Sequence, residues 1–298
     1  MAVNRRKFLK IGGASILAFG AKPAADALGI SPTEWLDEKL GGFTIPETLL
    51  HLFRKPAGSV AGEALTAKRW AMVVNVRALD EEIAEACKEA CHRVHNVPEI
   101  DNPKHEIKWI WQEEYEHVFP GQQHEHVDEA LKKLPFLVMC NHCFNPPCCR
   151  VCPTKATFKR KKDGIVLMDM HRCIGCRFCM AACPFGARSF NWIIPWPRAG
   201  AEEERRFKGK EPPTPDYPTR AKGVVEKCNF CAERLAKGQI PACVEVSQEL
   251  CKKKGREPAL VFGDLEDPDS EVRQLLRLHY TIRRKPELGS HPNVYYIV

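Results

Sequence analysis

The chain has 298 residues with a formal net charge of +7 at pH 7, and 15 of its residues are cysteine. This length is enough for one large or two small domains with a hydrophobic core. The basic residues form no stripe interleaved with aromatic side chains, and no nucleic-acid motif accompanies them, which argues against nucleic acid as a partner. We interpret the net positive charge as a contribution to solubility and as a weak electrostatic preference in docking to partners.

The amino terminus has the pattern of an export signal. Residues 4–10 read Asn-Arg-Arg-Lys-Phe-Leu-Lys, a twin-arginine motif, and the apolar run 11–21 that follows is too short to span a bilayer. We therefore expect residues 1–27 to be a signal segment. The protein would then be periplasmic and associated with the membrane through partners or a retained leader. Residues 28–67 are rich in proline, glycine and alanine and predict a linker.

Regular structure is expected from Arg69 onward. The β-branched apolar run from Trp70 to Val76 predicts a strand. A helix is expected from Asp80 to His92, with Asp80 as its N-cap and two glutamates in its first turn. Short apolar strands are then expected directly before three cysteine groups, at 136–139, 165–168 and 223–226.

Two cysteine groups near the middle of the chain carry the strongest signal. The later group has C-x2-C-x2-C-x3-C-P spacing, and the earlier group has the same pattern with two extra residues between its second and third cysteines. In bacterial two-cluster ferredoxins this spacing directs three thiolates to one 4Fe-4S cluster and the fourth to the neighbouring cluster. A zinc ribbon also uses C-x2-C pairs, but four cysteines per group and the two Cys-Pro endings favour iron-sulfur clusters. The eight residues are Cys140, Cys143, Cys148, Cys152, Cys173, Cys176, Cys179 and Cys183.

Two further cysteine groups are incomplete. Cys228 and Cys231 form a third C-x2-C pair, and Cys243 follows, but the fourth position of the pattern is Ser247. Cys87 and Cys91 have the spacing of the last two members of such a group. Its first two positions are occupied by Glu81 and Ala84.

The order of these motifs identifies a resemblance. The segments CNHCFNPPC, CIGCRFCMAACPFGARSFNW, EKCNFCAERL and HPNVYYIV resemble the DsrO-type iron-sulfur subunits. These subunits belong to a wider family with the electron-transfer subunits of polysulfide and dimethyl sulfoxide reductases. The resemblance covers residues 68–298 and implies an α+β fold of two ferredoxin-like modules with loop insertions and a C-terminal extension. The middle module would span about 136–190, and the outer module about 68–93 plus 223–262.

The resemblance also implies three 4Fe-4S clusters, whose ligand sets we call sites I, II and III. Site I would comprise Cys140, Cys143, Cys148 and Cys183. Site II would comprise Cys173, Cys176, Cys179 and Cys152. Site III would comprise Cys228, Cys231, Cys243 and Cys91.

A fourth cluster of the family should be missing. Its ligands would fall at a position set that we call the vacated site, which retains one cysteine: Glu81, Ala84, Cys87 and Ser247. In the family this site lies at one end of the row of clusters. We expect site II to become the terminal cluster at that end.

Five residues near these groups leave alternatives open. Cys149 could replace its neighbour Cys148 as a ligand, although the family spacing favours Cys148. Cys87 and Cys251 could form a disulfide or remain two buried thiols. His142 and His171 could hydrogen-bond to a cluster, but we expect surface polar contacts.

Two tryptophan-rich insertions lie between these groups. Residues 94–134 include Trp109 and Trp111, and residues 191–222 include Trp192 and Trp196. Their aromatic residues could lie in the core or face a partner, and we favour a partner surface.

No nucleophile, general base or substrate site is visible, so we do not expect the chain to be an enzyme by itself. The residues predict one-electron transfer through three clusters. The resemblance implies a quinone-interacting NrfD-type integral membrane subunit and a multihaem cytochrome c as partners, within a DsrMKJOP-like complex linked to sulfate or sulfite reduction. The alternatives are an iron-sulfur subunit of another respiratory oxidoreductase, of polysulfide, nitrite or hydrogenase type, and a structural adaptor with redox-inert clusters.

Overall fold

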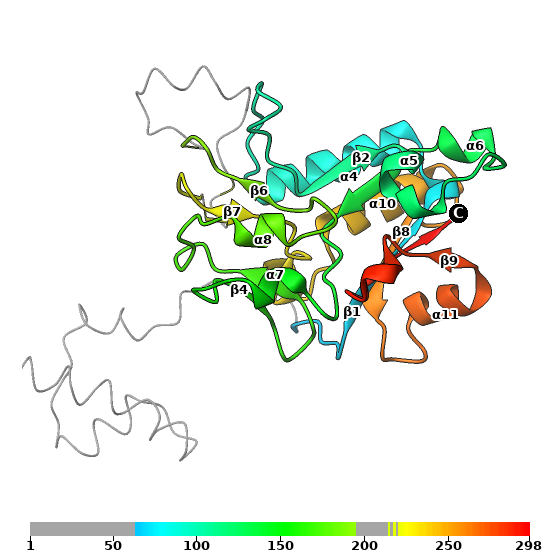
Figure 1. The fold of residues 1–298 in the computed structure, drawn as a ribbon. Helices are drawn as coiled ribbons and strands as arrows, with labels where there is room; N and C mark the ends of the chain where they lie inside the picture. Colours follow the sequence, from blue (N-terminus) through cyan, green and yellow to red (C-terminus); the bar gives the residue numbers. More distant parts are fainter. Residues whose placement is uncertain (1–62, 195–213, 215–216, 219) are drawn as a thin grey trace, which may run out of the picture. The chain divides into compact units, whose positions relative to one another are not determined.

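The largest sheet in the described part of the chain has four strands and lies on the right in Figure 1. The computed structural model describes residues 63–194, 214, 217–218 and 220–298, so the expected signal segment and nearly all of the expected linker lie outside it. Strand β1 (Trp70–Asn75) pairs in parallel with β10 (Val294–Ile297). It pairs antiparallel with β8 (Leu260–Asp264), and β9 (Thr281–Ile282) completes the sheet beside β10.

The position of β10 shows how the end of the chain joins the fold. The last strand lies inside the four-stranded sheet, next to the first strand. The physical reason is the composition of β1, whose first five residues are buried and apolar. Such a strand needs a hydrogen-bonded partner on each side, and β8 and β10 supply them.

Helices cover both faces of this sheet. Met72 and Val74 of β1 belong to the main core with helices α4 (Glu81–Val94) and α10 (Ala242–Lys253). Ala71 and Val73 point to the other face, where they pack with residues of α11 (Glu271–Leu278). The alternation of side chains along a strand sends neighbours to opposite faces, so the uninterrupted apolar run of β1 fits a strand buried on both sides.

The start of helix α4 confirms the prediction from the sequence. The Asp80 carboxylate accepts a hydrogen bond from the Ile83 amide at 2.9 Å, which is an N-cap contact. Glu81 and Glu82 lie in the first turn, where negative charge complements the helix dipole. The helix continues to Val94, two residues beyond the expected end.

The cysteine loops emerge from short antiparallel strand pairs. The predicted strand at 136–139 is confirmed in full, and the predictions at 165–168 and 223–226 are confirmed over their last residues. The pairs are β2 (Ile110–Glu113) with β3 (Phe136–Met139), β4 (Thr157–Lys159) with β5 (Val166–Met168), and β6 (Ser189–Phe190) with β7 (Val225–Glu226). Each of β3, β5 and β7 leads into a cysteine group.

Short helical turns complete the fold. Three of them, α7, α8 and α9, lie within or directly after the cysteine groups. The short elements are α5 (Tyr115–Val118), α6 (Glu129–Lys132), α7 (Pro147–Arg150), α8 (Phe178–Ala181), α9 (Ala232–Leu235), and the 3-10 turns Val76–Ala78, Pro120–Gln122 and Pro286–Leu288. This mixture of helices and small sheets is the expected α+β class, and the division into two modules stays a prediction.

The tryptophan-rich insertions do not behave alike. Trp109 is only 1% exposed, and its indole nitrogen donates to the buried Glu226 carboxylate at 2.6 Å, so the expected partner surface is wrong for this residue. Trp192 is 39% exposed. Trp196 lies outside the described residues. Among the described residues, no helix combines the length and the apolar character needed to cross a membrane.

Candidate metal centres

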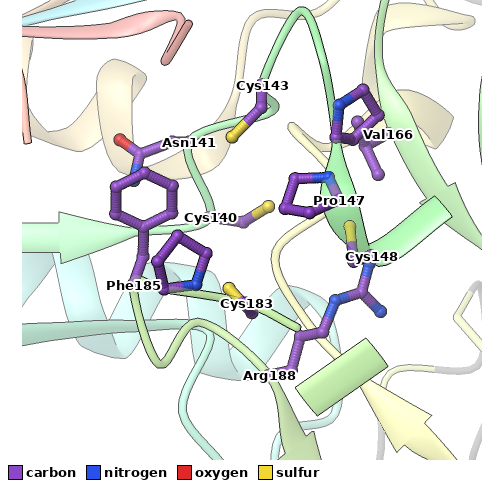
Figure 2. Close-up of a pocket in the computed structure, with 11 residues that line it drawn as sticks. Cys140, Asn141, Cys143, Pro147, Cys148, Val166, Cys183, Phe185 and Arg188 are labelled. Atoms are coloured by element: carbon purple, nitrogen blue, oxygen red, sulfur yellow. The ribbon is translucent and has the colours of Figure 1, made fainter. Parts of the chain in front are cut away.

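Site I is a cavity onto which the four predicted cysteines converge (Figure 2). Cys140 and Cys143 lie on the loop after β3, Cys148 lies in α7, and Cys183 follows α8. Phe185, Val166 and three prolines complete the wall, so most of the lining is apolar. In Figure 2 the sulfur atoms face a common space, and the arrangement can hold a group with four thiolate ligands.

The C-terminal segment holds the loop that carries Cys140 and Cys143. The amide of Phe144 donates to the carbonyl oxygen of His291 at 2.9 Å, and the amide of Asn145 donates to that of Ser290 at 3.0 Å. The Asn293 side chain donates to the carbonyl oxygen of His142 at 2.7 Å. The segment that leads into β10 therefore fixes the shape of site I and then continues into the four-stranded sheet.

Site II brings together Cys152, Cys173, Cys176 and Cys179 around a second cavity. Two backbone amides donate to its sulfur atoms at 3.5 Å, from Thr157 to Cys152 and from Val225 to Cys173. Gly175 has a φ of +71°, and a Cβ atom there would collide with the carbonyl oxygen of Gly223. Only glycine fits this turn, which positions the cysteines on either side of it.

Site III joins residues that are far apart in the sequence. Cys91 lies on α4, Cys243 lies on α10, and the Cys228–Cys231 pair precedes α9. Cys91 and Cys243 belong to one buried cluster, against which Cys228 packs, and Cys231 is buried against Ala90 and Ala242 beside them. Burial raises the pKa of Cys91 well above its ordinary value, and the thiols of the other three cysteines add to this increase. The packing of α4 against α10 creates this proximity.

A histidine and a carboxylate beside site III were missed by the sequence analysis. His95 is 1% exposed, and its Nδ1 atom lies 3.7 Å from the Cys91 sulfur atom. Its Nε2 atom lies 2.7 Å from the carboxylate of Glu233. The available signals were the spacing of His95 four residues after Cys91, which places both at one end of α4, and the position of Glu233 two residues after Cys231.

The vacated site is filled by a continuous helix. In site II, Cys173 and Cys176 lie on a non-helical loop before α8, whereas the corresponding positions 81 and 84 lie within α4. Ala84, Cys87 and Ser247 are completely buried. The Cys87 thiol donates to the Cys243 carbonyl oxygen at 3.3 Å, and the Ser247 hydroxyl accepts from the Leu260 amide at 3.2 Å. Core packing thus occupies the place of the fourth cluster.

This arrangement decides between the two alternatives for Cys87 and Cys251 and corrects one expectation about the vacated site. Cys87 and Cys251 are free thiols, so the hypothetical disulfide is not formed; burial raises the pKa of Cys87 to about 12, and the nearby Cys251 thiol adds to it. The vacated site also adjoins Cys243 of site III, not site II. The reason is geometric, because Cys87 and Cys91 lie one turn apart on the same helix.

The choice between Cys148 and Cys149 is decided by position. Cys148 lines the site I cavity, and Cys149 does not. A hydrogen bond from the Cys149 thiol lowers the pKa of Cys148 to about 5, and the charges of Arg188 and Lys227 act in the same direction against burial. Its place in the wall of the cavity makes Cys148, and not Cys149, the candidate ligand of site I.

His142 is buried, so the expected surface contact is wrong for this residue, whereas His171 is exposed as expected. The His142 ring stacks on Phe230 with 3.7 Å between the centroids, and the Nδ1 atom of His142 accepts from the Val166 amide at 3.1 Å. Burial lowers the pKa of His142 well below its ordinary value, with the charges of Lys227 and Arg188 acting in the same direction. The stacked pair connects the loop of Cys143 in site I with the loop of Cys228 and Cys231 in site III.

Two buried cations near the cavities indicate that the group bound there carries negative charge. Arg188 and Lys227 are 5% and 2% exposed, and neither forms an ion pair with a carboxylate within the described ranges. The Nη2 atom of Arg188 has no hydrogen-bond partner there. An unpaired buried charge is costly, whereas a cluster held by four thiolates is anionic. The donor set therefore fits 4Fe-4S clusters, whose negative charge would balance these cations.

Comparison with known proteins agrees with the assignment of these sites to iron-sulfur clusters. A 4Fe-4S dicluster domain matches residues 133–214, which include sites I and II. The iron-sulfur subunit 1 of an Hdr-like menaquinol oxidoreductase from Archaeoglobus fulgidus is 37% identical over 99% of this chain and 97% of the relative. The iron-sulfur cluster-binding subunit of menaquinone reductase from Nitratidesulfovibrio vulgaris is 34% identical over 77% and 88%. A homologue of the protein NrfC from Haemophilus influenzae is 34% identical over 81% and 85%.

Proposed function

Because the chain belongs to the iron-sulfur subunits of the quinol oxidoreductase family, we propose that it relays single electrons through three 4Fe-4S clusters at sites I, II and III. Each cluster would supply the uptake and release of one electron. The chain would fix the order of the clusters, shield them from water and set their potentials. No catalytic residue of its own is required for this role.

The observation that carries the proposal is the contiguity of the three sites. Cys228 of site III packs against the buried cluster that contains Cys140 and Cys143, so sites III and I are neighbours. Cys148 of site I and Cys179 of site II belong to one buried cluster, so sites I and II are neighbours. The order II, I, III is a continuous row, which an electron relay needs.

The two ends of the row differ in exposure. Cys176 of site II is exposed, and beside it the side chains of Ile174 and Phe178 are 66% and 59% exposed. Arg172 and Arg177 are also exposed there. At site III, three of the four cysteines are buried. We propose that site II exchanges electrons with a partner whose surface carries acidic residues.

Iron analysis and redox titration of the purified complex test the proposal. We expect about twelve iron atoms per chain, since three clusters hold four each, and three centres that are reduced by quinol or by a cytochrome. Sixteen iron atoms would contradict our interpretation of the vacated site. Three clusters that accept no electron would favour the structural adaptor.

We also propose the finer features that the sequence suggested. The partners would be an NrfD-type integral membrane subunit and a multihaem cytochrome c, in a periplasmic DsrMKJOP-like complex of sulfate or sulfite respiration. The relatives named as subunits of a menaquinol oxidoreductase and of menaquinone reductase support a quinone-linked partner. Purification of the tagged chain from membranes tests this, because a membrane subunit and a haem protein should accompany it. Recovery with a molybdenum-containing subunit instead would favour another respiratory oxidoreductase.

A further inference from the structure

Arg188 lies at the boundary between sites I and II. Its guanidinium donates from Nη1 to the Thr157 hydroxyl at 3.1 Å, which leaves its positive charge uncompensated. The thiols of Cys148, from site I, and Cys179, from site II, lie near enough to interact with this charge. Figure 2 shows the guanidinium reaching up to the Cys148 sulfur atom at the edge of the cavity.

Lys227 has the corresponding place between sites I and III. Its ammonium group donates to the carbonyl oxygen of the site III ligand Cys228 at 2.7 Å. It also donates to the carbonyl oxygen of Val166, a residue that lines the site I cavity. Both acceptors are neutral, so this charge is uncompensated as well, and it acts on Cys148 and on Cys228.

The buried cation Arg220 is different. Arg220 is 4% exposed and forms an ion pair with Glu226, which is completely buried. This pair carries no net charge. Among these three side chains, only Arg188 and Lys227 therefore place net positive charge next to the cysteine sulfur atoms.

We propose that Arg188 and Lys227 are fixed charges that each raise the reduction potential of two clusters, Arg188 at sites I and II and Lys227 at sites I and III. The inference rests on the proposed electron relay. One electron passes from cluster to cluster while both side chains keep their protons. Because uptake of an electron adds negative charge, a nearby buried cation stabilises the reduced form more than the oxidised form, with little screening by salt. Site I receives the effect of both charges.

The test is a redox titration of the holo-complex, monitored by electron paramagnetic resonance, in Arg188→Met and Lys227→Met variants. Signals are assigned beforehand by their loss in Cys183→Ala (site I), Cys152→Ala (site II) and Cys91→Ala (site III). Arg188→Met should shift the oxidised-to-reduced equilibrium of sites I and II about tenfold toward oxidised, equal to about 59 mV for one electron, and leave site III unchanged. Lys227→Met should shift sites I and III and leave site II unchanged.

Conservative variants separate charge from packing. Arg188→Lys keeps the charge and should retain the wild-type potentials, whereas Arg188→Gln keeps a hydrogen-bond donor without the charge and should behave like Arg188→Met. Wild-type potentials in Arg188→Gln, or an equal shift at all three sites in either methionine variant, would overturn the proposal. Iron content is measured for every variant. A wild-type protein with fewer than three redox-active clusters would refute the proposed function, whereas three clusters with unshifted potentials would refute this inference alone.

Discussion

The Nε atom of Arg220 donates to the Oε2 atom of Glu226 at 2.7 Å, and both side chains are inaccessible to solvent. Glu226 also accepts hydrogen bonds from Trp109 at 2.6 Å and from Asn191 at 2.6 Å. Glu226 lies in β7, two residues before Cys228 of site III. This network therefore connects the insertions to the strand that leads into the third cysteine group.

Arg220→Met should destabilise the protein strongly. It leaves the Glu226 carboxylate buried without its cation, and loss of one partner of a buried pair costs about 3–5 kcal/mol. Chemical denaturation of the variant and the wild type measures the difference. The double variant with Glu226→Gln is the control and should recover part of the loss. Equal stability of the single variant and the wild type would contradict the role given to this pair.

The exchange of ligands between sites I and II can be tested with two alanine variants. Cys183 lies next to the site II loop in sequence but lines the site I cavity, and Cys152 shows the converse relationship. Cys183→Ala should lose the cluster of site I, and Cys152→Ala that of site II. Each variant should fall from about twelve to about eight iron atoms, by the arithmetic of four per cluster. If both variants lose the same spectroscopic signal, the exchange is wrong.

Cys148 and Cys149 provide a matched pair of neighbouring thiols. Cys148→Ser should remove one cluster because the substituted residue lines the cavity. Cys149→Ser should retain all three clusters, since the Cys149 side chain serves as a hydrogen-bond donor to Cys148, which a hydroxyl can replace. Iron content and cluster absorbance of the two variants decide the assignment. The reverse pattern would make Cys149 the ligand.

Asp80 makes the stability of α4 dependent on pH. Burial acts to raise the pKa of Asp80, but hydrogen bonds from Lys254 and the Ile83 amide, with the charges of Lys254 and Arg256, lower it below its ordinary value. Since the folded pKa lies below that of the unfolded chain, this stabilisation is present above about pH 4 and is lost as the pH falls through the folded pKa.

Two variants separate the charge of Asp80 from its capping function. Asp80→Ala should lose about 1 kcal/mol at neutral pH because the N-cap contact is removed. Asp80→Asn can still cap the helix but has no charge, so its thermal stability should fall less than that of the wild type between pH 5 and 3. Parallel pH profiles for Asp80→Asn and the wild type would show that the carboxylate charge does not contribute.

Arg177 should influence electron exchange at site II. It is exposed beside Cys176, and its guanidinium lies 4.7 Å from the centre of the Trp192 ring. Arg177→Glu should slow electron transfer to an acidic partner about tenfold at low salt and weaken the dependence of the rate on salt. Arg277→Glu, on exposed α11, is the matched control and should leave the rate unchanged. Equal effects of both variants would argue against docking at site II.

The sequence was most informative where the chemistry is local. The spacing of cysteines within each group predicts which thiols converge at sites I and II, because the geometry of a short loop is set by the few residues that form it. Burial cannot be read from such spacing, so Arg188 and Lys227 look like ordinary surface cations, and His142 was wrongly expected at the surface. We also expected the vacated site at the end of the row beside site II, whereas it adjoins site III. The separation of Cys87 and Cys91 by one helical turn could have indicated this, because Cys91 is a ligand of site III.

The continuous helix α4 has a consequence for how the protein is assembled. In site III, Cys91 and Cys243 are brought together by the packing of α4 on α10, and the vacated site beside them is held by core contacts that need no metal. This end of the polypeptide can therefore acquire its native helix pairing before any iron arrives. A cluster would then bind at site III to cysteines that the helix pair has already brought together, so iron starvation should leave the α4–α10 pair folded.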